Sequence, residues 1–543
     1  MIRPLSPERQ AAMNRWAKWL TVAALIVFPF VYGLVALHRG EDADWDLMNY
    51  HFFDPFWVLV NNQHDIMPAQ LQTYYNPLLD FPFYLAARHL SPRVVAYGIA
   101  FVQGLSFPIV YLVARVFTRR RLLALVAAGL GMFAAGALSE IGSVMGDTLT
   151  APFLLGGILL GLYACRPAAH GARRRVLALA AGAGLVSGFG SGLKLSAFPF
   201  TVATVVAFFV IGLPFARRFA VAFASGCGAL VGLLISYGWW GYDLATKWGS
   251  PLLPYLNQVF ASPWAPQASN TDARRLPHGV LQAIFYPFLW TQQPLRTSPQ
   301  PFRELTMPAL EAVLLLLVVK AIAVTARRRG WRPIFGSDAE RFLVVLTIVT
   351  YLIWVDVFAI YRYLIPLEML TFVLLGVCLR RLFTPLKPWR PIAAVVLVAI
   401  VVASLLTEET DNIGRTAWAS RYITVLVPAS IVHPAAFLMI GTQPEAYVVP
   451  YFPSDDFFAR IQANIRLTPT VVARIKKDLK AYSHVYLFWV DPNSFPSDAA
   501  LLSQPRPPWA TYGFKVNTSA CVAIPARIGT VGQSVRTCQL VRT

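Results

Sequence analysis

Acidic side chains are scarce in this chain, which has 27 Asp and Glu against 47 Lys and Arg in 543 residues. Charged residues of both signs make up only 14% of the sequence, whereas a soluble globular chain carries about 25%. Together with 56% hydrophobic residues and a mean hydropathy of +0.53, this deficit excludes a soluble globular protein. The composition predicts a polytopic α-helical membrane protein.

Two further absences narrow the class. No clear small-residue cleavage site follows the first apolar run, and that run is longer than the core of about 7–15 residues in a signal peptide, so we interpret it as a retained helix. No convincing repeat of the helical pattern occurs along the chain, and the loops expected outside the membrane are large. Both observations disfavour a compact transporter, which usually has short loops and internal repeats.

Apolar windows recur along the chain as far as residue 407, and about 20 such residues are enough to cross the hydrocarbon core. They predict eleven spans, at residues 19–38, 94–117, 122–139, 148–165, 176–192, 195–213, 219–239, 309–326, 342–358, 363–379 and 391–407. The weakest are 176–192 and 195–213, where Gly188, Gly190, Gly192 and Lys194 interrupt one long apolar run. We expect a tight re-entry turn at this interruption.

Basic clusters mark every second boundary between these spans. They are Arg3, Arg9, Arg15 and Lys18, then Arg119–Arg121, Arg173–Arg175, Arg217–Arg218, Arg327–Arg329 and Arg380–Arg381. The positive-inside rule places all of them on the cytoplasmic side, which leaves residues 39–93, 240–308 and the tail after 408 outside. We therefore expect a multi-pass protein of the bacterial inner membrane with a cytoplasmic N-terminus. The same rule explains much of the net charge of +20, so no nucleic-acid partner is expected.

The tail, residues 408–543, is proline-rich and mixed in polarity, which is typical of a soluble domain. The pattern predicts strands at 436–440 and 484–490, and helices at 455–465 and 469–482. Helices between such strands suggest a small α/β domain. We therefore expect two domains: a membrane domain, residues 1–407 with external loops 39–93 and 240–308, and a periplasmic α/β domain, residues 408–543.

Cysteine is also rare, with five residues in the chain. Cys165, Cys227 and Cys378 lie in or beside apolar spans, where we expect them to be apolar filler. Cys521 and Cys538 flank a Gly-Thr-Val-Gly turn signal in the part of the chain expected to meet an oxidising compartment. A disulfide that closes a hairpin is expected there, with two free buried thiols as the alternative.

The scarce carboxylates cluster just after the first apolar span. Glu41, Asp42, Asp44 and Asp46 fall within six residues, interleaved with or followed by Trp45, Tyr50 and His51. Such a cluster at the end of a membrane helix suggests acid/base or metal chemistry at the membrane surface, and the alternative is a solvated loop. With His51 and Asp65 the same side chains would suit Mg²⁺ or Mn²⁺, so metal-dependent and metal-free chemistry both stay open.

The same loop continues with amide and aromatic side chains that alternate with proline. Gln70, Gln72, Tyr74 and Asn76 suit carbohydrate, because amides hydrogen-bond to hydroxyl groups and aromatic faces stack on sugar rings. The alternative is an amphipathic helix at the membrane interface, anchored by its aromatic residues. The two interpretations are compatible.

A third group lies at the external junction of two late spans, between Asp356 and Glu368. Within it, Arg362 runs against the positive-inside trend. Ionisable groups at membrane depth are costly unless they are paired, so Arg362 is a functional candidate. A guanidinium suits bidentate contact with phosphate oxygens, and the alternative is an ion pair of Arg362 with Asp356 or Glu368.

Two more ionisable side chains are expected on the same side of the membrane. Lys194, in the glycine-broken turn, is a second external cation that could share a phosphate with Arg362. Asp147, at the start of the fourth span, is a further external carboxylate.

These features together resemble the GT-C class of integral-membrane glycosyltransferases, over about residues 15–407. Asp46-Leu-Met-Asn-Tyr50-His51 is similar to the Asp-Glu-x-x-Tyr-(His) pattern of that class, and Tyr361-Arg362-Tyr363-Leu-x-Pro-Leu is similar to its late arginine setting. Many helices and a periplasmic C-terminal domain fit the same class. Leu47 stands where Glu is common, so either Asp44 or Asp46 would occupy the catalytic place.

The resemblance implies a hexosyl- or pentosyltransferase with a polyprenyl-phosphate-sugar donor held between helices and a glycan or lipid acceptor. Asp44 or Asp46 would be the general base toward an acceptor hydroxyl, and Arg362, Lys194 and Tyr361 would bind the donor phosphate. Substrate-binding roles would fall to Tyr50, His51, Gln70, Gln72, Tyr74, Asn76 and Asp147.

Other function classes remain as alternatives. The chain has no P-loop and no Gly-x-Gly-x-x-Gly after a strand, which disfavours a nucleotide-sugar donor. A transporter or flippase of lipid-linked glycans would explain the arginine and the aromatic residues, but not the clustered carboxylates or the tail. A transferase or ligase acting on other lipid-linked material, such as whole oligosaccharide chains or phospho-groups, is the third class.

Overall fold

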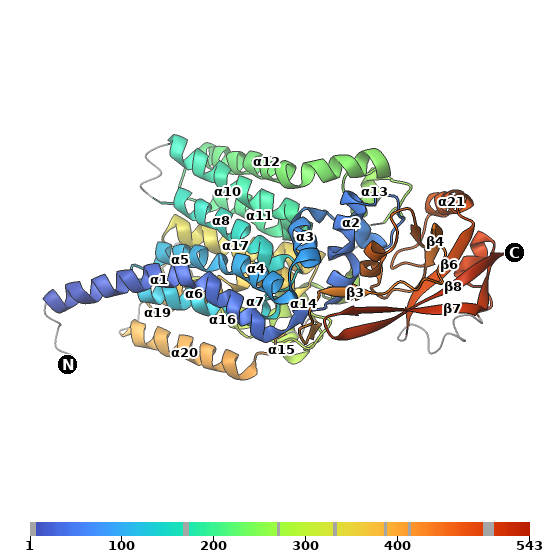
Figure 1. Cartoon of the computed structure of the whole chain (residues 1–543). Coiled ribbons are helices and arrows are strands. Elements are labelled where there is room, and N and C mark those ends of the chain that lie inside the picture. Colours follow the sequence, from blue (N-terminus) through green and yellow to red (C-terminus); the bar gives the residue numbers. More distant parts are fainter. Residues whose placement is uncertain are drawn as a thin grey trace. The chain divides into compact units, whose positions relative to one another are not determined.

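The computed structural model describes residues 7–166, 173–268, 272–328, 334–384, 388–410, 414–491 and 504–543. The chain divides into two compact units (Figure 1). Unit 1 comprises Met1–Ala36, Tyr97–Ser236 and Asp272–Asn412, and unit 2 comprises Leu37–Ala96, Tyr237–Thr271 and Ile413–Thr543.

Unit 1 is built from helices. They are α1 (Pro7–Arg39), α4 (Pro92–Gly104), α5 (Ser106–Phe117), α6 (Arg121–Met132), α7 (Ala135–Ser139), α8 (Asp147–Ala164), α10 (Arg173–Leu193), α11 (Phe198–Ala207), α12 (Phe215–Trp248), α14 (Val280–Ile284), α15 (Tyr286–Gln292), α16 (Thr306–Arg328), α17 (Asp338–Val357), α18 (Ile365–Glu368), α19 (Thr371–Phe383) and α20 (Trp389–Thr407), of which α1, α4 and α12 continue into unit 2. In Figure 1, α8 packs beside α10, and α11 beside α17.

Among the described residues, seven helical segments are long and apolar enough to cross a membrane, and the bent pair Tyr361–Glu368 with Thr371–Phe383 makes an eighth. The seven are Arg15–Arg39, Pro92–Phe117, Asp147–Ala164, Arg173–Leu193, Phe215–Trp248, Thr306–Ala326 and Trp389–Thr407. The other three expected spans coincide with the shorter helices Arg121–Met132 and Leu195–Val210 and with α17, whose first turn carries Asp338 and Glu340. The chain is a polytopic α-helical membrane protein.

The glycines of α10 serve helix packing rather than a turn. Gly184 and Gly188 lie inside α10, which continues to Leu193, and the break falls at Lys194. A Cβ atom on Gly188 would overlap the carbonyl oxygen of Ala229, and one on Gly184 that of Ser225, both on α12. The expected re-entry turn therefore begins later than the glycines suggest, because their lack of a side chain is used to bring two helix backbones together.

This packing gives a prediction about stability. Gly188→Ala is expected to lower the free energy of unfolding by about 1–3 kcal/mol, because the added methyl group forces two packed helices apart. Gly226→Ala on α12 is the matched control, since nothing lies within 4 Å of the Cβ position there. Thermal unfolding of both variants in detergent checks the difference. Equal melting temperatures would contradict the proposed close contact.

Unit 2 contains a mixed six-stranded sheet in the order β3-β7-β8-β6-β4-β5. Its strands are β3 (Ile423–Val425), β4 (Ala435–Met439), β5 (Phe457–Arg460), β6 (His484–Asp491), β7 (Phe514–Ile528) and β8 (Val531–Arg542), and its helices are α2 (Phe53–Leu59), α3 (Phe81–His89), α13 (Asn257–Phe260) and α21 (Pro469–Asp478). Strands β5 and β6 run parallel to β4, while β8, β7 and β3 add antiparallel pairs. This confirms the expected α/β character of the tail.

The prediction of a helix at 455–465 is wrong. Phe457–Arg460 forms the strand β5, and all four of its residues are buried. Parallel pairing with β4 on one side and a bridge from Ala459 to Ile66 on the other satisfy its backbone, so tertiary pairing overrides the helical pattern. The predicted strands at 436–440 and 484–490 and the helix from Pro469 are confirmed.

The loop after α1, residues 40–91, contributes to this sheet. The amide of Ile66 donates to Phe458 and the amide of Arg460 donates to Ile66, while the buried Asp65 carboxylate accepts from the amide of Phe458 at 2.8 Å. Nearer its start, the loop forms β1 (Glu41–Asp42), which pairs antiparallel with β2 (Arg415–Thr416) after the last membrane helix. The carboxylate-rich loop and the tail therefore build one unit.

A disulfide joins the two longest strands of the sheet. Cys521 on β7 and Cys538 on β8 are register partners, and their Cα atoms are 4.0 Å apart. The bond encloses the turn between the two strands, where the sequence places Gly529.

Candidate functional site

The carboxylates of the first loop are buried in unit 2. Asp44 is 2% exposed and Asp46 is 9% exposed. One oxygen of Asp44 accepts a hydrogen bond from the amide of Leu47 at 2.9 Å, where the chain turns into the short π-helix η1 (Leu47–His51). Its other oxygen is buried without a hydrogen-bond partner among the described residues. One oxygen of Asp44 is therefore fixed by the backbone, and the other is buried with its hydrogen-bonding capacity unused among the described residues.

The surroundings of Asp44 make it a poor acid. Burial raises the pKa of its carboxyl well above the ordinary value, and the negative charges of Asp42 and Asp46 raise it further. The Leu47 amide opposes this shift but does not cancel it. A carboxylate with a raised pKa takes a proton more readily, which is the property required of a general base.

Glu41 gives a prediction about pH and stability. Burial, opposed by hydrogen bonds, raises its pKa from 4.5 to about 7. The contribution of Glu41 to the free energy of unfolding is therefore fully present below pH 4.5. It is lost as the pH rises through about 7, because the buried carboxyl must then ionise. Glu41→Gln should keep the hydrogen bond from Ala419 and stabilise the protein by about 2 kcal/mol above that range. Melting temperatures at pH 4 and pH 8 test this; an equal gain at both would contradict it.

His51 belongs to a second buried cluster that includes one residue not anticipated from the sequence. Its Nδ1 lies 2.8 Å from Asp80, and its ring lies 4.1 Å from that of Tyr50. Asp54 on α2 is 1% exposed with neither oxygen hydrogen-bonded among the described residues, and burial and the charge of Asp80 raise its pKa. The sequence could have identified Asp54, because it is a single carboxylate within the aromatic run Phe52-Phe53-Asp54-Pro55-Phe56-Trp57, where burial is expected.

The side chains expected to contact carbohydrate have contacts within unit 2. Gln70 is fully buried, accepts from the amide of Asn464 at 2.9 Å and donates to Thr442. Gln72 accepts from the Asn464 side chain, and Asn76 caps the next helical turn by accepting from the amide of Leu78. Tyr74 is 1% exposed and packs edge-on against Trp57 and Trp248. These contacts order the loop around its carboxylates.

The candidate metal ligands are not gathered into one set. Within the described ranges, no group of three or more His, Cys, Asp or Glu side chains is placed to hold a metal ion. His51 pairs with Asp80, while Asp44 caps η1. We therefore derive no step through Mg²⁺ or Mn²⁺.

Unit 1 holds a cluster of two cations around one carboxylate. Lys194 lies between α10 and α11, Arg362 lies in the helical turn before α18, and Asp147 begins α8. The Asp147 carboxylate is 2.6 Å from Lys194 Nζ and 3.7 Å from Arg362 Nε. Both cations also lie over the Tyr363 ring, at 5.5 and 5.4 Å from its centroid. Three elements far apart in sequence thus converge on one polar site.

The cluster keeps a net positive charge. Two cations share the single charge of Asp147, and the neighbouring Glu140 is buried. Burial and the charge of Asp147 raise the pKa of Glu140, which favours its neutral form. The Lys194 and Arg362 side chains are 16% and 25% exposed, so the surplus charge is accessible to an anion.

The other residues near Arg362 have structural partners. The Tyr361 hydroxyl donates to Glu368 at 2.9 Å, and the same carboxylate accepts from the amides of Gly136 and Ala137. Tyr361 is 2% exposed and packs against Trp290 and Phe302. Glu368 is thus occupied by these donors, and the ion pair of Arg362 is formed with Asp147.

Comparison with known proteins gives a limited result. No protein-family model and no curated protein matches this chain. Crystal structures of ArnT from Cupriavidus metallidurans are similar to it at 14% identity. The structure bound to undecaprenyl phosphate covers 95% of this chain and 97% of its own, with a TM-score of 0.48, and the apo structure covers 97% and 98%, with a TM-score of 0.49. At this identity, no residue role is transferred from ArnT.

Proposed function

We propose that this protein is a membrane glycosyltransferase of the GT-C class that transfers a sugar from a polyprenyl-phosphate donor to a glycan or lipid acceptor. The buried carboxylate of Asp44 carries this proposal. An oxygen held in place by the Leu47 amide, a second oxygen without a partner and a raised pKa are the properties of a general base. Transfer to an acceptor hydroxyl requires such a base, whereas movement of an intact lipid-linked glycan forms no new bond at a hydroxyl.

In this proposal Asp44 accepts the proton of an acceptor hydroxyl. The hydroxyl oxygen forms a bond to the anomeric carbon of the donor, the bond from that carbon to the phosphate oxygen breaks, and polyprenyl phosphate leaves. The leaving phosphate gains negative charge, which Lys194 and Arg362 stabilise. Asp46 tunes the base, because its charge raises the pKa of Asp44.

Turnover of a donor tests the proposal. The purified protein in nanodiscs would be given short-chain polyprenyl-phosphate hexoses and pentoses together with an envelope glycan and lipid extract. Mass spectrometry then follows free polyprenyl phosphate and glycosylated acceptor. Acceptor-dependent release of polyprenyl phosphate supports a glycosyltransferase. Transfer of the phosphate with the sugar would establish a phospho-group transferase. In sealed proteoliposomes, movement of intact donor between leaflets without cleavage would establish the flippase alternative.

A further inference from the structure

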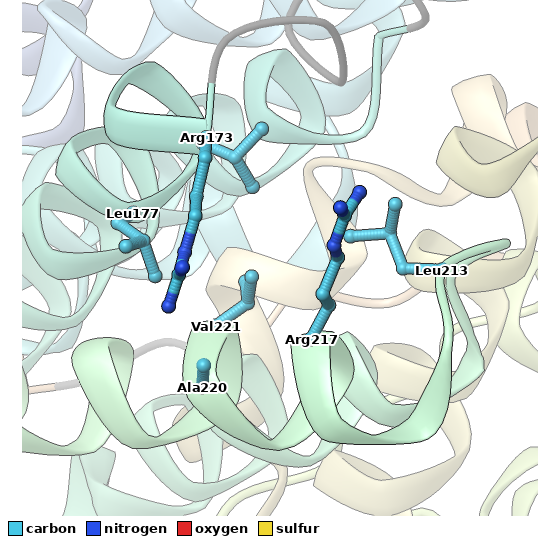
Figure 2. Close-up of a pocket in the computed structure, with 7 residues that line it drawn as sticks. Arg173, Leu177, Leu213, Arg217, Ala220 and Val221 are labelled. Atoms are coloured by element: carbon cyan, nitrogen blue, oxygen red, sulfur yellow. The ribbon is translucent and has the colours of Figure 1, made fainter.

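A small hollow lies in unit 1 between the first turns of two long helices (Figure 2). Arg173, Val176 and Leu177 of α10 line one side, and Arg217, Ala220 and Val221 of α12 line the other, with Leu213 just before α12. Its volume is about 30 Å³. On the same measure a space of about 10–15 Å³ holds one water molecule, so the hollow has room for two or so oxygen-sized groups, such as oxygens of a phosphate, and not for a whole sugar.

The hollow carries uncompensated positive charge. Figure 2 shows Arg173 and Arg217 on opposite sides of the same space, and no acidic residue lines it. Neither guanidinium has a hydrogen bond or ion pair with the residues that the structure describes. By contrast, the adjacent Arg218 donates to the carbonyl of Leu213, and Arg341 pairs with Asp338. Two cations that face one hollow without a counter-charge favour a bound anion.

Both helices add to this preference. α10 has 21 residues and begins at Arg173, and α12 has 34 residues and begins at Phe215. The first turns of both helices therefore lie at the hollow, and their dipoles are positive at this end. The remaining walls are apolar, from Val176, Leu177, Leu213 and Val221. An anion with apolar substituents can pair with the two arginines and also pack against the apolar walls, whereas a free phosphate can only pair with the arginines.

We propose that this hollow binds the phosphate of an anionic phospholipid, held between Arg173 and Arg217 with the lipid body along the apolar wall. Basic pockets between membrane helices are suited to such headgroups. The site differs from the proposed donor site, since Lys194 follows the opposite end of α10. A helix of 21 residues is about 30 Å long, so the two sites lie about one hydrocarbon thickness apart. The positive-inside rule assigns the hollow to the cytoplasmic leaflet.

Native mass spectrometry tests this site on the full chain. Protein released from nanodiscs of phosphatidylglycerol and phosphatidylcholine is expected to retain one phosphatidylglycerol preferentially. Arg173→Gln with Arg217→Gln should reduce that retention at least about tenfold. Arg174→Gln with Arg175→Gln is the control, because it removes the same total charge, from the start of α10, without changing a residue of the lining. The control should retain the lipid.

Further measurements separate the outcomes. An equal loss in both double variants would overturn the site, since it would reflect net charge alone, and so would no preference for phosphatidylglycerol in the wild type. Displacement of the lipid by millimolar inorganic phosphate would show that the hollow recognises phosphate without a lipid body, which contradicts the proposal. If the double variant does not fold, Arg217→Gln alone against Arg174→Gln alone gives the same comparison with a smaller effect.

Discussion

Asp44→Asn is expected to lower the rate of sugar transfer by at least about a hundredfold, because a general base contributes about 10²–10⁴-fold to such a step. The side-chain amide of Asn cannot take up the proton of the substrate hydroxyl. Its oxygen can still accept the hydrogen bond from the Leu47 amide. The variant should therefore fold and bind donor as the wild type does. Turnover and donor binding, measured on the same preparation, separate the two effects.

The same substitution should also stabilise the protein. The folded-state pKa of Asp44 lies above its ordinary value, so stability is full at low pH and is lost as the pH rises through the raised pKa. Asn removes this cost of ionisation at neutral pH. In the wild type, transfer should increase with pH through the same range, because only the ionised carboxylate is a base. A loss of activity with a gain in melting temperature is the signature of a group kept for function.

Asp46→Asn is the control for this prediction. Asp46 contributes charge that raises the pKa of Asp44, so its removal should shift the pH dependence of transfer to lower pH and change the maximal rate only mildly. If Asp44→Asn keeps full activity and Asp46→Asn does not, the base is Asp46. If both variants fold and keep full activity, the first external loop is not the catalytic site.

Arg362→Gln and Asp147→Asn are expected to change the affinity for polyprenyl phosphate in opposite directions. The first removes a cation, and a hydrogen bond to a charged group contributes about 1.5–3 kcal/mol, so affinity should fall about tenfold to a hundredfold. The second removes the carboxylate that both cations share, which raises the net charge of the cluster and should tighten binding. Titration of a short-chain polyprenyl phosphate into each variant gives the comparison.

Arg362 is a cleaner choice than Lys194 for this test. Lys194 is the closest ion-pair partner of the buried Asp147, at 2.6 Å, so its removal would leave a buried charge without compensation. Arg362 lies farther away, at 3.7 Å, and Asp147 keeps Lys194 when it is lost. If Arg362→Gln does not fold, the ion pair between Arg362 and Asp147 has a structural role rather than a role in phosphate binding. Weaker binding in both variants would show that Asp147 itself contacts the ligand.

Local patterns predicted much of the fold because apolar length is a local property. The apolar windows coincide with helices along the whole membrane part, and the alternation around Ala435–Met439 and His484–Asp491 gave two strands. The strand at Phe457–Arg460 was missed because its pairing, with β4 on one side and with Ile66 of a distant loop on the other, is tertiary. The role of Gly188 was missed because only the neighbouring helix reveals that a side chain would not fit.

The candidate site divides in the same way. Charge against the positive-inside trend identified Arg362, and the expected position on the same side added Lys194 and Asp147; the structure places these three side chains together. Composition suggested carbohydrate contacts for Gln70 and Asn76. Composition cannot predict that Gln70 accepts from the distant Asn464 amide, or that Asn76 accepts from the Leu78 amide in a local turn. Choosing Asp44 over Asp46 likewise needed tertiary information: the hydrogen bond from the Leu47 amide and the raised pKa of the Asp44 carboxyl.

The pairing of β1 with β2 has a consequence for biosynthesis. Residues 41–42 are translated long before their strand partners at 415–416, which follow the helix α20. The backbone hydrogen bonds of Ile66 likewise require Phe458 and Arg460, which are translated much later. The loop that carries Asp44 therefore cannot form its native strand pairing while the helices are being inserted. It folds only after the tail has been translated. A chain that stops after residue 407 would keep the membrane-spanning helices of the described residues but lack the strand partners of this loop, so we expect it to be inactive in the proposed sugar transfer.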